Sequence, residues 1–130
     1  MKVIDVACAI INIDGKTLVV QRSVDMKLPL KWEFPGGKIE VGESDEHCIK
    51  REIREELNIE IEIVERLTPT HFDYDSFAIR LVPFIANYIH GEIKLKEHSQ
   101  YLLLDKNELL DLDLDWAEAD VSVVNAFVEL

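Results

Sequence analysis

The chain has 130 residues, which is enough for one domain with one hydrophobic core and too short for two. Apolar residues make up 48% of it and charged residues 31%, a composition typical of globular proteins. The formal net charge of −12 argues against a nucleic acid polymer as a partner, because contacts to its phosphates need clustered Lys and Arg. A small nucleotide is not excluded, since a metal ion can bridge its phosphates to carboxylates.

The sequence predicts a cytoplasmic protein without a membrane partner. No apolar run approaches the roughly 18–20 residues that a membrane span requires. The first 13 residues contain Asp5 and lack a cleavage site, so we expect no signal peptide. Cys8 lies in an apolar run and Cys48 on a predicted helix, without metal-ligand spacing, so both are expected to be buried or idle thiols in a reducing compartment.

The N-terminal third predicts a hairpin followed by a loop. Residues 3–13 are rich in Val, Ile and Ala and predict a buried strand, Asp14-Gly15 is a hairpin turn signal, and residues 17–22 predict the returning strand. Residues 23–31 predict a loop that either closes over a ligand or only connects. The adjacent glycines at 36–37 either let the backbone approach a ligand or metal closely or form a simple turn.

A helix of roughly 13 residues is predicted to end at Leu57, because no Gly or Pro interrupts the chain after Ser44. Ser44 suits the N-cap, and Asp45 and Glu46 follow in the first turn, where negative charge suits the helix dipole. Asn58 suits a left-handed C-cap.

This helix has an apolar stripe that must pack against the core and an acidic face beside it. The stripe consists of Ile49, Ile53 and Leu57, and the acidic face of Glu52, Glu55 and Glu56. A solvated acidic face is the ordinary interpretation of such a pattern. The alternative is a site for a hard divalent cation, since like charges at i and i+4 otherwise cost the helix roughly 0.2–0.5 kcal/mol.

The second half of the chain predicts three strands and two helices. The strands cover residues 60–67, 77–89 and 99–104, and the helices cover residues 106–110 and 117–130. Residues 68–76 are expected to be extended or looped, and Pro83 indicates a sheet edge or a bulge. The whole pattern predicts an α+β fold with helices packed on a mixed sheet.

The stretch from Gly37 to Ile59 resembles the Nudix box of the Nudix hydrolases. The positions that carry the resemblance are Gly37, Glu43, Arg51, Glu52, Ile53, Glu55, Glu56 and Ile59. The family usually has Gly where this chain has Asn58, which tolerates the same backbone region. The resemblance extends over nearly the whole chain. It implies one Nudix domain over residues 1–130, an α/β/α sandwich with a mixed β-sheet between helices.

The resemblance also implies hydrolysis of a phosphoanhydride by metal-assisted attack of water. The implied metal ligands are the Gly36 carbonyl, Glu52, Glu55 and Glu56, with Mg²⁺ as the ion and Mn²⁺ as a substitute.

The roles of the residues that support the metal site, and the identity of the general base, stay open between alternatives. Arg51 would orient a box carboxylate such as Glu43 by bidentate pairing, or form only a surface pair with Glu55. Glu43 is either an outer group of the metal site or a loop surface carboxylate. The general base is open between box glutamates and Glu97, which matches a metal-binding or base glutamate of MutT-like members or is a solvated loop residue. The four histidines are expected to be ordinary surface or satisfied residues.

Residues 32–40, WEFPGGKIE, resemble the MutT-type branch, which acts on nucleoside triphosphates. The resemblance implies that Arg22 contacts phosphate or base, that Phe34 packs near the base and that Lys38 contacts phosphate; core packing is the alternative for Phe34. The remaining implied substrate-binding residues of this segment are Glu33, Pro35, Gly36 and Gly37.

Residues 116–120, WAEAD, resemble members of the family that act as CTP pyrophosphohydrolases. Asp120 would accept hydrogen bonds from an exocyclic amine or a ring N–H of the base, or donate one if protonated. MutT itself has Asn at this position. The alternative is that Asp120 only caps a helix beginning at Val121.

The leading hypothesis is a Mg²⁺-dependent Nudix pyrophosphohydrolase that cleaves a nucleoside triphosphate to the monophosphate and pyrophosphate. The expected substrates are CTP, dCTP and modified pyrimidine nucleotides, or 8-oxo-dGTP in nucleotide-pool sanitation. The alternatives are a hydrolase of another diphosphate, such as ADP-ribose or a dinucleotide, and a non-catalytic nucleotide-binding Nudix module. The protein is expected to be a monomer or a homodimer.

Overall fold

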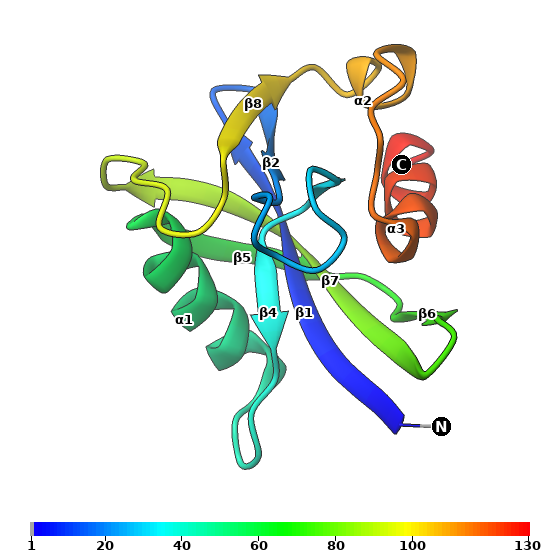
Figure 1. Ribbon diagram of the computed structural model, residues 1–130. Helices are drawn as coiled ribbons and strands as arrows, with labels where there is room; N and C mark the ends of the chain where they lie inside the picture. Colours follow the sequence, from blue (N-terminus) through cyan, green and yellow to red (C-terminus); the bar gives the residue numbers. More distant parts are fainter. Residues whose placement is uncertain (1) are drawn as a thin grey trace.

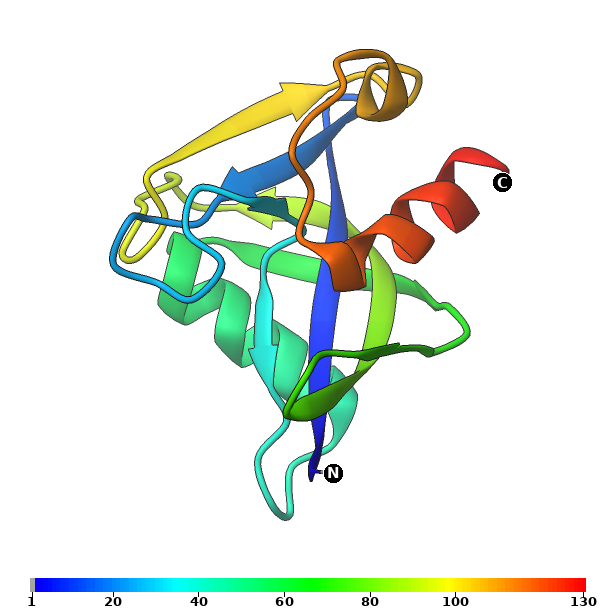
Figure 2. The ribbon, with the colours of Figure 1, turned by 45° about the vertical axis from the view of Figure 1, so that its right-hand side comes forward.

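A mixed β-sheet with helices on both faces forms the fold of residues 2–130, which the computed structural model describes (Figures 1 and 2). The strands are β1 Lys2–Ile13, β2 Lys16–Gln21, β3 Trp32–Glu33, β4 Gly36–Lys38, β5 Glu60–Arg66, β6 Thr70–Asp73, β7 Phe77–His90 and β8 Gln100–Leu104. The helices are α1 Asp45–Leu57, α2 Glu108–Asp111 and α3 Glu118–Val128. The predicted α+β class is therefore confirmed.

Strand β1 organises the sheet. Along one edge it pairs in parallel with β7, from Lys2 opposite Phe77 to Asn12 opposite Asn87. Along its other edge β1 pairs first with β4 and then, near its C-terminal end, with β2, both antiparallel. Figure 2 shows β2 running away from β1, whereas β4 runs alongside β1. The sheet therefore splits on this side of β1.

Two hydrophobic clusters hold the helices on opposite faces of the sheet. The stripe of α1, made of Ile49, Ile53 and Leu57, is fully buried in one cluster, as predicted. Val123 and Val124 of α3 and Leu109 of α2 are buried in the other. Among residues 2–130 no helix is both long enough and apolar enough to cross a membrane.

The predicted ends of α1 are confirmed. Ser44 is the N-cap, and its hydroxyl oxygen accepts a hydrogen bond from the His47 N–H at 3.1 Å. Asn58 is the C-cap in the left-handed conformation, with φ 62° and ψ 27°. Its side chain also donates to the Glu92 carbonyl at 3.1 Å, a bond that a glycine at this position would lack.

The glycine pair forms strand rather than a turn. Gly36 lies opposite Cys8 of β1, and a Cβ at Gly36 would come within 1.9 Å of the Ala7 carbonyl oxygen. The two strands approach so closely only because residue 36 has no side chain. Strands β3 and β4 are too short, with two and three residues, for side-chain periodicity to reveal them in the sequence.

Of the two alternatives for Pro83, a sheet edge or a bulge, the sheet edge is wrong, because β7 has neighbours on both sides. Pro83 lies opposite Cys8 of β1. On the other side β7 changes partner here: its pairing with β5 ends at Phe84, and its pairing with β6 begins at Leu81. A residue without an N–H is tolerated at such an interruption of the ladder.

Candidate active site

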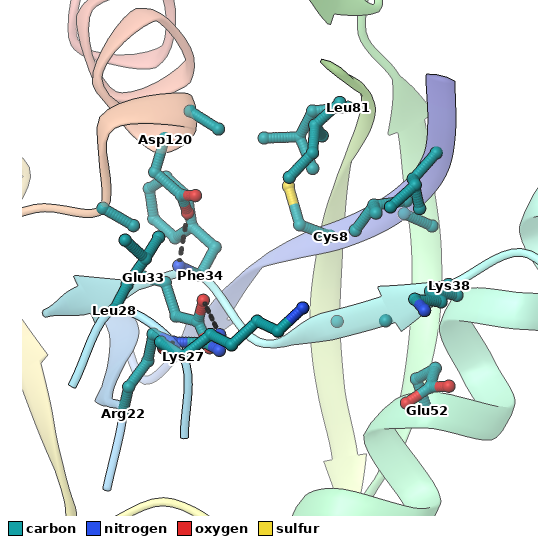
Figure 3. Close-up of a pocket in the computed structure, with 18 of the residues that line it drawn as sticks. Cys8, Arg22, Lys27, Leu28, Glu33, Phe34, Lys38, Glu52, Leu81 and Asp120 are labelled. Atoms are coloured by element: carbon teal, nitrogen blue, oxygen red, sulfur yellow. Dashed lines mark hydrogen bonds and ion pairs between the residues drawn. The ribbon is translucent and has the colours of Figure 1, made fainter. Parts of the chain in front are cut away.

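A cavity of about 590 Å³ lies where β1, β2 and β4 diverge (Figure 3). Its walls include Cys8 of β1, Arg22 after β2, the two glycines of β4, and side chains from β7 and from the start of α3. One end is acidic and borders α1, while the other end is mostly apolar and borders α3. The chain thus places the two groups of predicted site residues in one cavity.

The acidic end contains two of the predicted metal ligands, Glu52 and Glu56. A Cβ at Gly37 would lie 2.3–2.6 Å from the carboxyl atoms of Glu52, so that carboxylate rests directly against the backbone of β4. Glu56 is buried, and its Oε2 has no hydrogen-bond partner. Burial, together with the negative charge of Glu52, raises the pKa of Glu56 to about 9.

Glu55 lies apart from these two carboxylates. Its side chain is 59% exposed, it does not line the cavity, and its Oε2 accepts a hydrogen bond from Arg51 Nη1 at 3.1 Å. Arg51 Nη1 also donates to Glu52 Oε1 at 2.9 Å. Over residues 2–130 no three acidic, His or Cys side chains are close enough to hold a metal ion. The predicted three-glutamate set is therefore not assembled in this structure, since Arg51 holds two of its members.

The predicted bidentate pairing of Arg51 with Glu43 is present. Arg51 Nε and Nη2 donate to the two oxygens of Glu43 at 2.6 and 2.9 Å. Glu43 also accepts from the Glu40 N–H at 3.1 Å and contacts the His47 ring at 2.9 Å. With 8% of its side chain exposed, Glu43 is no loop surface carboxylate. The Arg51 guanidinium holds the pKa of Glu43 well below its usual value.

Glu97 reaches the acidic end from the segment between β7 and β8. This segment runs along the end of α1, where Lys94 N–H donates to the Leu57 carbonyl at 3.0 Å and Lys96 N–H to the Glu56 carbonyl at 3.1 Å. Glu97 lines the cavity and is one of the charges that raise the pKa of Glu56. Its metal-binding or base role stays a prediction.

The acidic end fits a hard divalent cation. A buried carboxylate oxygen of Glu56 lacks any partner, and the carboxylate of Glu52 adds negative charge close by. An unpaired buried carboxylate is costly unless a cation or a proton neutralises it. Oxygen donors of this kind suit Mg²⁺, which keeps several waters and so does not need every ligand from the protein.

Asp120 lies at the opposite end of the cavity. Helix α3 begins at Glu118 with Ala117 as its N-cap, so the alternative in which Asp120 caps a helix from Val121 is wrong. Asp120 is buried, and its Oδ2 accepts a hydrogen bond from the Phe34 N–H at 2.9 Å. Burial, followed by the negative charge of Glu33, raises the pKa of Asp120.

Main-chain pairing brings α3 to this position. Trp32 N–H donates to the Asp115 carbonyl at 2.8 Å, and Ala117 N–H donates to the Trp32 carbonyl at 2.8 Å. Phe34, which follows β3, both lines the cavity and is buried in the core, and the centre of its ring is 5.4 Å from that of Trp116. The core-packing alternative for Phe34 is therefore confirmed, and its packing near the base stays a prediction that its place in the cavity wall allows.

The other predicted substrate-binding residues differ in their access to the cavity. Lys38 and the two glycines of β4 line it. Pro35 does not, and its carbonyl instead accepts a hydrogen bond from the Ala9 N–H at 2.9 Å. The prediction for Pro35 is therefore corrected to a main-chain contact with β1.

The guanidinium group of Arg22 forms hydrogen bonds within the protein. Its Nη1 donates to Glu33 Oε1 at 3.0 Å, and its Nε donates to the Lys27 carbonyl (Figure 3). The second oxygen of Glu33 lies 2.9 Å from Nε2 of His98. The expectation that His98 is an ordinary satisfied histidine is wrong, because it is buried, it contacts a cavity residue, and its Nδ1 has no partner.

The loop between β2 and β3 forms part of the cavity wall. The sequence did not decide whether this loop lies over a ligand or only connects the two strands. Met26, Lys27 and Leu28 line the cavity, and the Lys27 side chain extends across it in Figure 3, with Nζ 5.9 Å from the centre of the Phe77 ring. The loop sequence did not predict that Lys27 lines a cavity, since a single lysine in a polar loop is usually solvated.

The comparisons with known proteins agree with this fold. The sequence model of the NUDIX domain family matches residues 1–127. The CTP pyrophosphohydrolase of Escherichia coli K12 is 35% identical over 130 residues, covering 100% of this chain and 95% of that protein. The 8-oxo-dGTP diphosphatase of the same organism is 40% identical over 73 residues, 55% of this chain and 50% of its own. The solution structure of the E. coli ORF135 protein superposes with a TM-score of 0.85 at 34% identity, over 100% of this chain and 91% of that one.

The match over residues 1–127 includes every strand and both ends of the cavity. The chain belongs to the Nudix family of hydrolases. The α/β/α arrangement expected from the Nudix box is thereby confirmed.

Proposed function

We propose that the protein is a Mg²⁺-dependent pyrophosphohydrolase of nucleoside triphosphates, with release of the nucleoside monophosphate and pyrophosphate. The proposed substrates are CTP, dCTP and modified pyrimidine nucleotides, or 8-oxo-dGTP. The similarity to the E. coli CTP pyrophosphohydrolase over the whole chain, and to the E. coli 8-oxo-dGTP diphosphatase over 73 residues, supports this substrate class.

The observation that carries the proposal is the division of one cavity into an acidic and an apolar end. Glu52 and Glu56 lie at the first, and Asp120 with the Phe34 N–H lies at the second. A nucleotide has the same division, with phosphates that need a bridging cation and a base that needs an apolar slot with directional polar groups.

The residues of the acidic end serve the phosphates. Glu52 and Glu56, with the Gly36 carbonyl, are the proposed holders of the cation. When bound, Mg²⁺ neutralises charge on the phosphoryl oxygens and activates water for attack. Lys27 and Lys38 line the same cavity, and neither forms an ion pair within residues 2–130, so both are available to a triphosphate.

The residues of the apolar end serve the base. Asp120 has a carboxyl oxygen besides the one bonded to Phe34, and that group accepts from an amine or ring N–H, or donates when it carries a proton. Phe34 closes the slot with its ring. A polar group buried at such a site discriminates strongly between bases that do and do not complete its hydrogen bonds.

The test is pyrophosphate release from a panel containing CTP, dCTP, 5-methyl-dCTP and 8-oxo-dGTP, with Mg²⁺ or with EDTA. We expect metal-dependent release from at least one of them, and a reduction of at least about tenfold in turnover for Glu56→Gln, which removes a proposed holder of the cation, with the fold retained. Nucleotide binding without turnover in Mg²⁺ or Mn²⁺ would instead identify a binding module. Release from ADP-ribose alone would identify a hydrolase of other diphosphates.

A further inference from the structure

His98 is the one buried histidine among residues 2–130, and only 1% of its side chain is exposed. Its ring Nε2 lies 2.9 Å from Glu33 Oε2, across 65 residues of sequence. Glu33 itself is mostly buried in the cavity wall, with 16% of its side chain exposed. A carboxylate buried to this extent needs donors on its oxygens to keep one orientation.

The two oxygens of Glu33 have separate donors. Arg22 Nη1 donates to Oε1 at 3.0 Å, and the His98 ring serves Oε2. Arg22 Nε donates in turn to the carbonyl of Lys27, whose side chain lies across the cavity. A continuous set of contacts therefore runs from His98 through Glu33 and Arg22 to the loop that forms one wall.

Main-chain hydrogen bonds hold the loop that carries His98 on both flanks. Lys96 N–H donates to the Glu56 carbonyl at 3.1 Å on one side, and Ser99 N–H donates to the Gln21 carbonyl at 3.0 Å on the other. Because main-chain bonds fix both flanks, the ring is free to serve Glu33. The unpartnered Nδ1 agrees with this, since the ring forms no other hydrogen bond that would justify its burial.

We propose that His98 is a positioning residue for substrate binding, which with Arg22 fixes the Glu33 carboxylate in the cavity wall. The inference rests on the proposed function, in which the cavity takes a nucleotide. Without the His98 donor, Glu33 keeps only Arg22, and the carboxylate and guanidinium are free to shift together. The expected defect is weaker binding of nucleotide rather than slower chemistry, because neither His98 nor Glu33 is a proposed holder of the cation.

The test compares His98→Gln with His98→Met. The two side chains have nearly the same length, but only Gln carries an N–H donor for Glu33. His71→Gln, on the exposed surface of β6, is the control for loss of a histidine elsewhere. We measure KM and kcat for the preferred nucleoside triphosphate. Calorimetry without metal gives the Kd of dCMP and of 8-oxo-dGMP.

We expect His98→Met to raise KM and the monophosphate Kd about tenfold, with kcat within about twofold, and His98→Gln to restore most of the binding. In a Glu33→Gln background, His98→Met should add no further loss, because the partner is already changed.

Three results overturn the inference. The first is that Met and Gln at position 98 change KM and Kd equally. The second is that the losses of binding caused by His98→Met and Glu33→Gln multiply in the double variant. The third is that His98→Met lowers kcat and leaves KM unchanged. A melting temperature for His98→Met close to that of the wild type excludes unfolding as the cause of weaker binding; if that variant is unfolded, the double-variant comparison is made with His98→Asn. Failure of the wild type to bind or hydrolyse any nucleotide overturns the proposed function and this inference together. If the wild type is active and His98→Met has the same KM, kcat and Kd as the wild type, the inference alone is overturned.

Discussion

Asp120 shows how much a single buried residue depends on its distant partner. Its hydrogen bond comes from the neutral Phe34 N–H, 86 residues away, and burial raises its pKa. Such a group favours the protonated form in the folded protein. The free energy of unfolding of the wild type should therefore fall as the pH rises above about 4, the unfolded pKa, until the folded pKa is passed.

Asp120→Asn should remove this pH dependence, because Asn keeps an oxygen for the Phe34 N–H and carries no charge. We expect the variant to be more stable than the wild type at pH 8, with a difference that widens by up to about 1.4 kcal/mol per pH unit between the two pKa values. Urea unfolding at pH 5 and pH 8 measures it. A constant difference between the two proteins at both values would contradict the assigned direction of the shift.

Gly36 and Gly37 are adjacent, yet the structure predicts opposite consequences for their substitution by Ala. At Gly36 the new Cβ would meet the Ala7 backbone at 1.9 Å, and backbone cannot move aside without breaking the β1–β4 pairing. At Gly37 the nearest atoms would be those of the Glu52 carboxyl group, the far end of a side chain rather than backbone.

Gly36→Ala should therefore cost about 3 kcal/mol or more in unfolding free energy. Gly37→Ala should cost less than about 1 kcal/mol but reduce turnover roughly 100-fold, because a displaced Glu52 misplaces the cation. Chemical denaturation and pyrophosphate release separate the two effects. Similar stability losses in both variants would show that the two glycines have the same role.

At the scale of elements, Glu43 joins the loop before α1 to the helix itself. It accepts hydrogen bonds from Arg51 in α1 and from the Glu40 N–H in the loop. Its pKa is held well below the usual value, so the stability it contributes is present above the unfolded pKa of about 4.5 and is lost as the pH falls through the folded pKa.

Glu43→Gln should lower the melting temperature at pH 7, since a neutral amide leaves Arg51 without its bidentate partner. The difference from the wild type should shrink as the pH falls below about 4.5, because Glu43 of the unfolded chain then takes up a proton while the folded carboxylate beside Arg51 stays ionised. Differential scanning calorimetry from pH 3 to pH 7 follows this trend, with Glu62→Gln on the exposed face of β5 as the control. A deficit that persists unchanged at pH 3 would mean that shape, not charge, holds the loop.

The elements differ in how far local sequence predicts them. Helix α1 follows from its apolar spacing, Ser44 at one end and Asn58 at the other, all of which act within a few residues. Strands β3 and β4 have no such local signal. They form because Trp32–Glu33 pairs with β2 and Gly36–Lys38 pairs with β1, and these partners lie far away in the chain.

At the scale of the whole molecule, the unpartnered carboxylate of Glu56 links metal binding to stability. Mg²⁺ should raise the melting temperature of the wild type, because a ligand that binds only the folded state stabilises it by about 2.7 kcal/mol at 100 times its Kd. Glu56→Gln should abolish this response, and Glu62→Gln should keep it. Thermal scans in EDTA and in increasing Mg²⁺ make the comparison; an undiminished response in Glu56→Gln would place the cation elsewhere.

The sequence by itself determined the helix of the Nudix box, its caps, its buried stripe and the mixed α+β class, because these follow from local dihedral preferences and side-chain spacing. Only the tertiary structure decided which carboxylates share the cavity, with Glu56 inside and Glu55 turned toward Arg51. It also decided the meeting of Asp120 with Phe34 and of His98 with Glu33, across 86 and 65 residues. Such contacts are set by how strands pair and helices pack over long distances, and no periodicity within one segment encodes them.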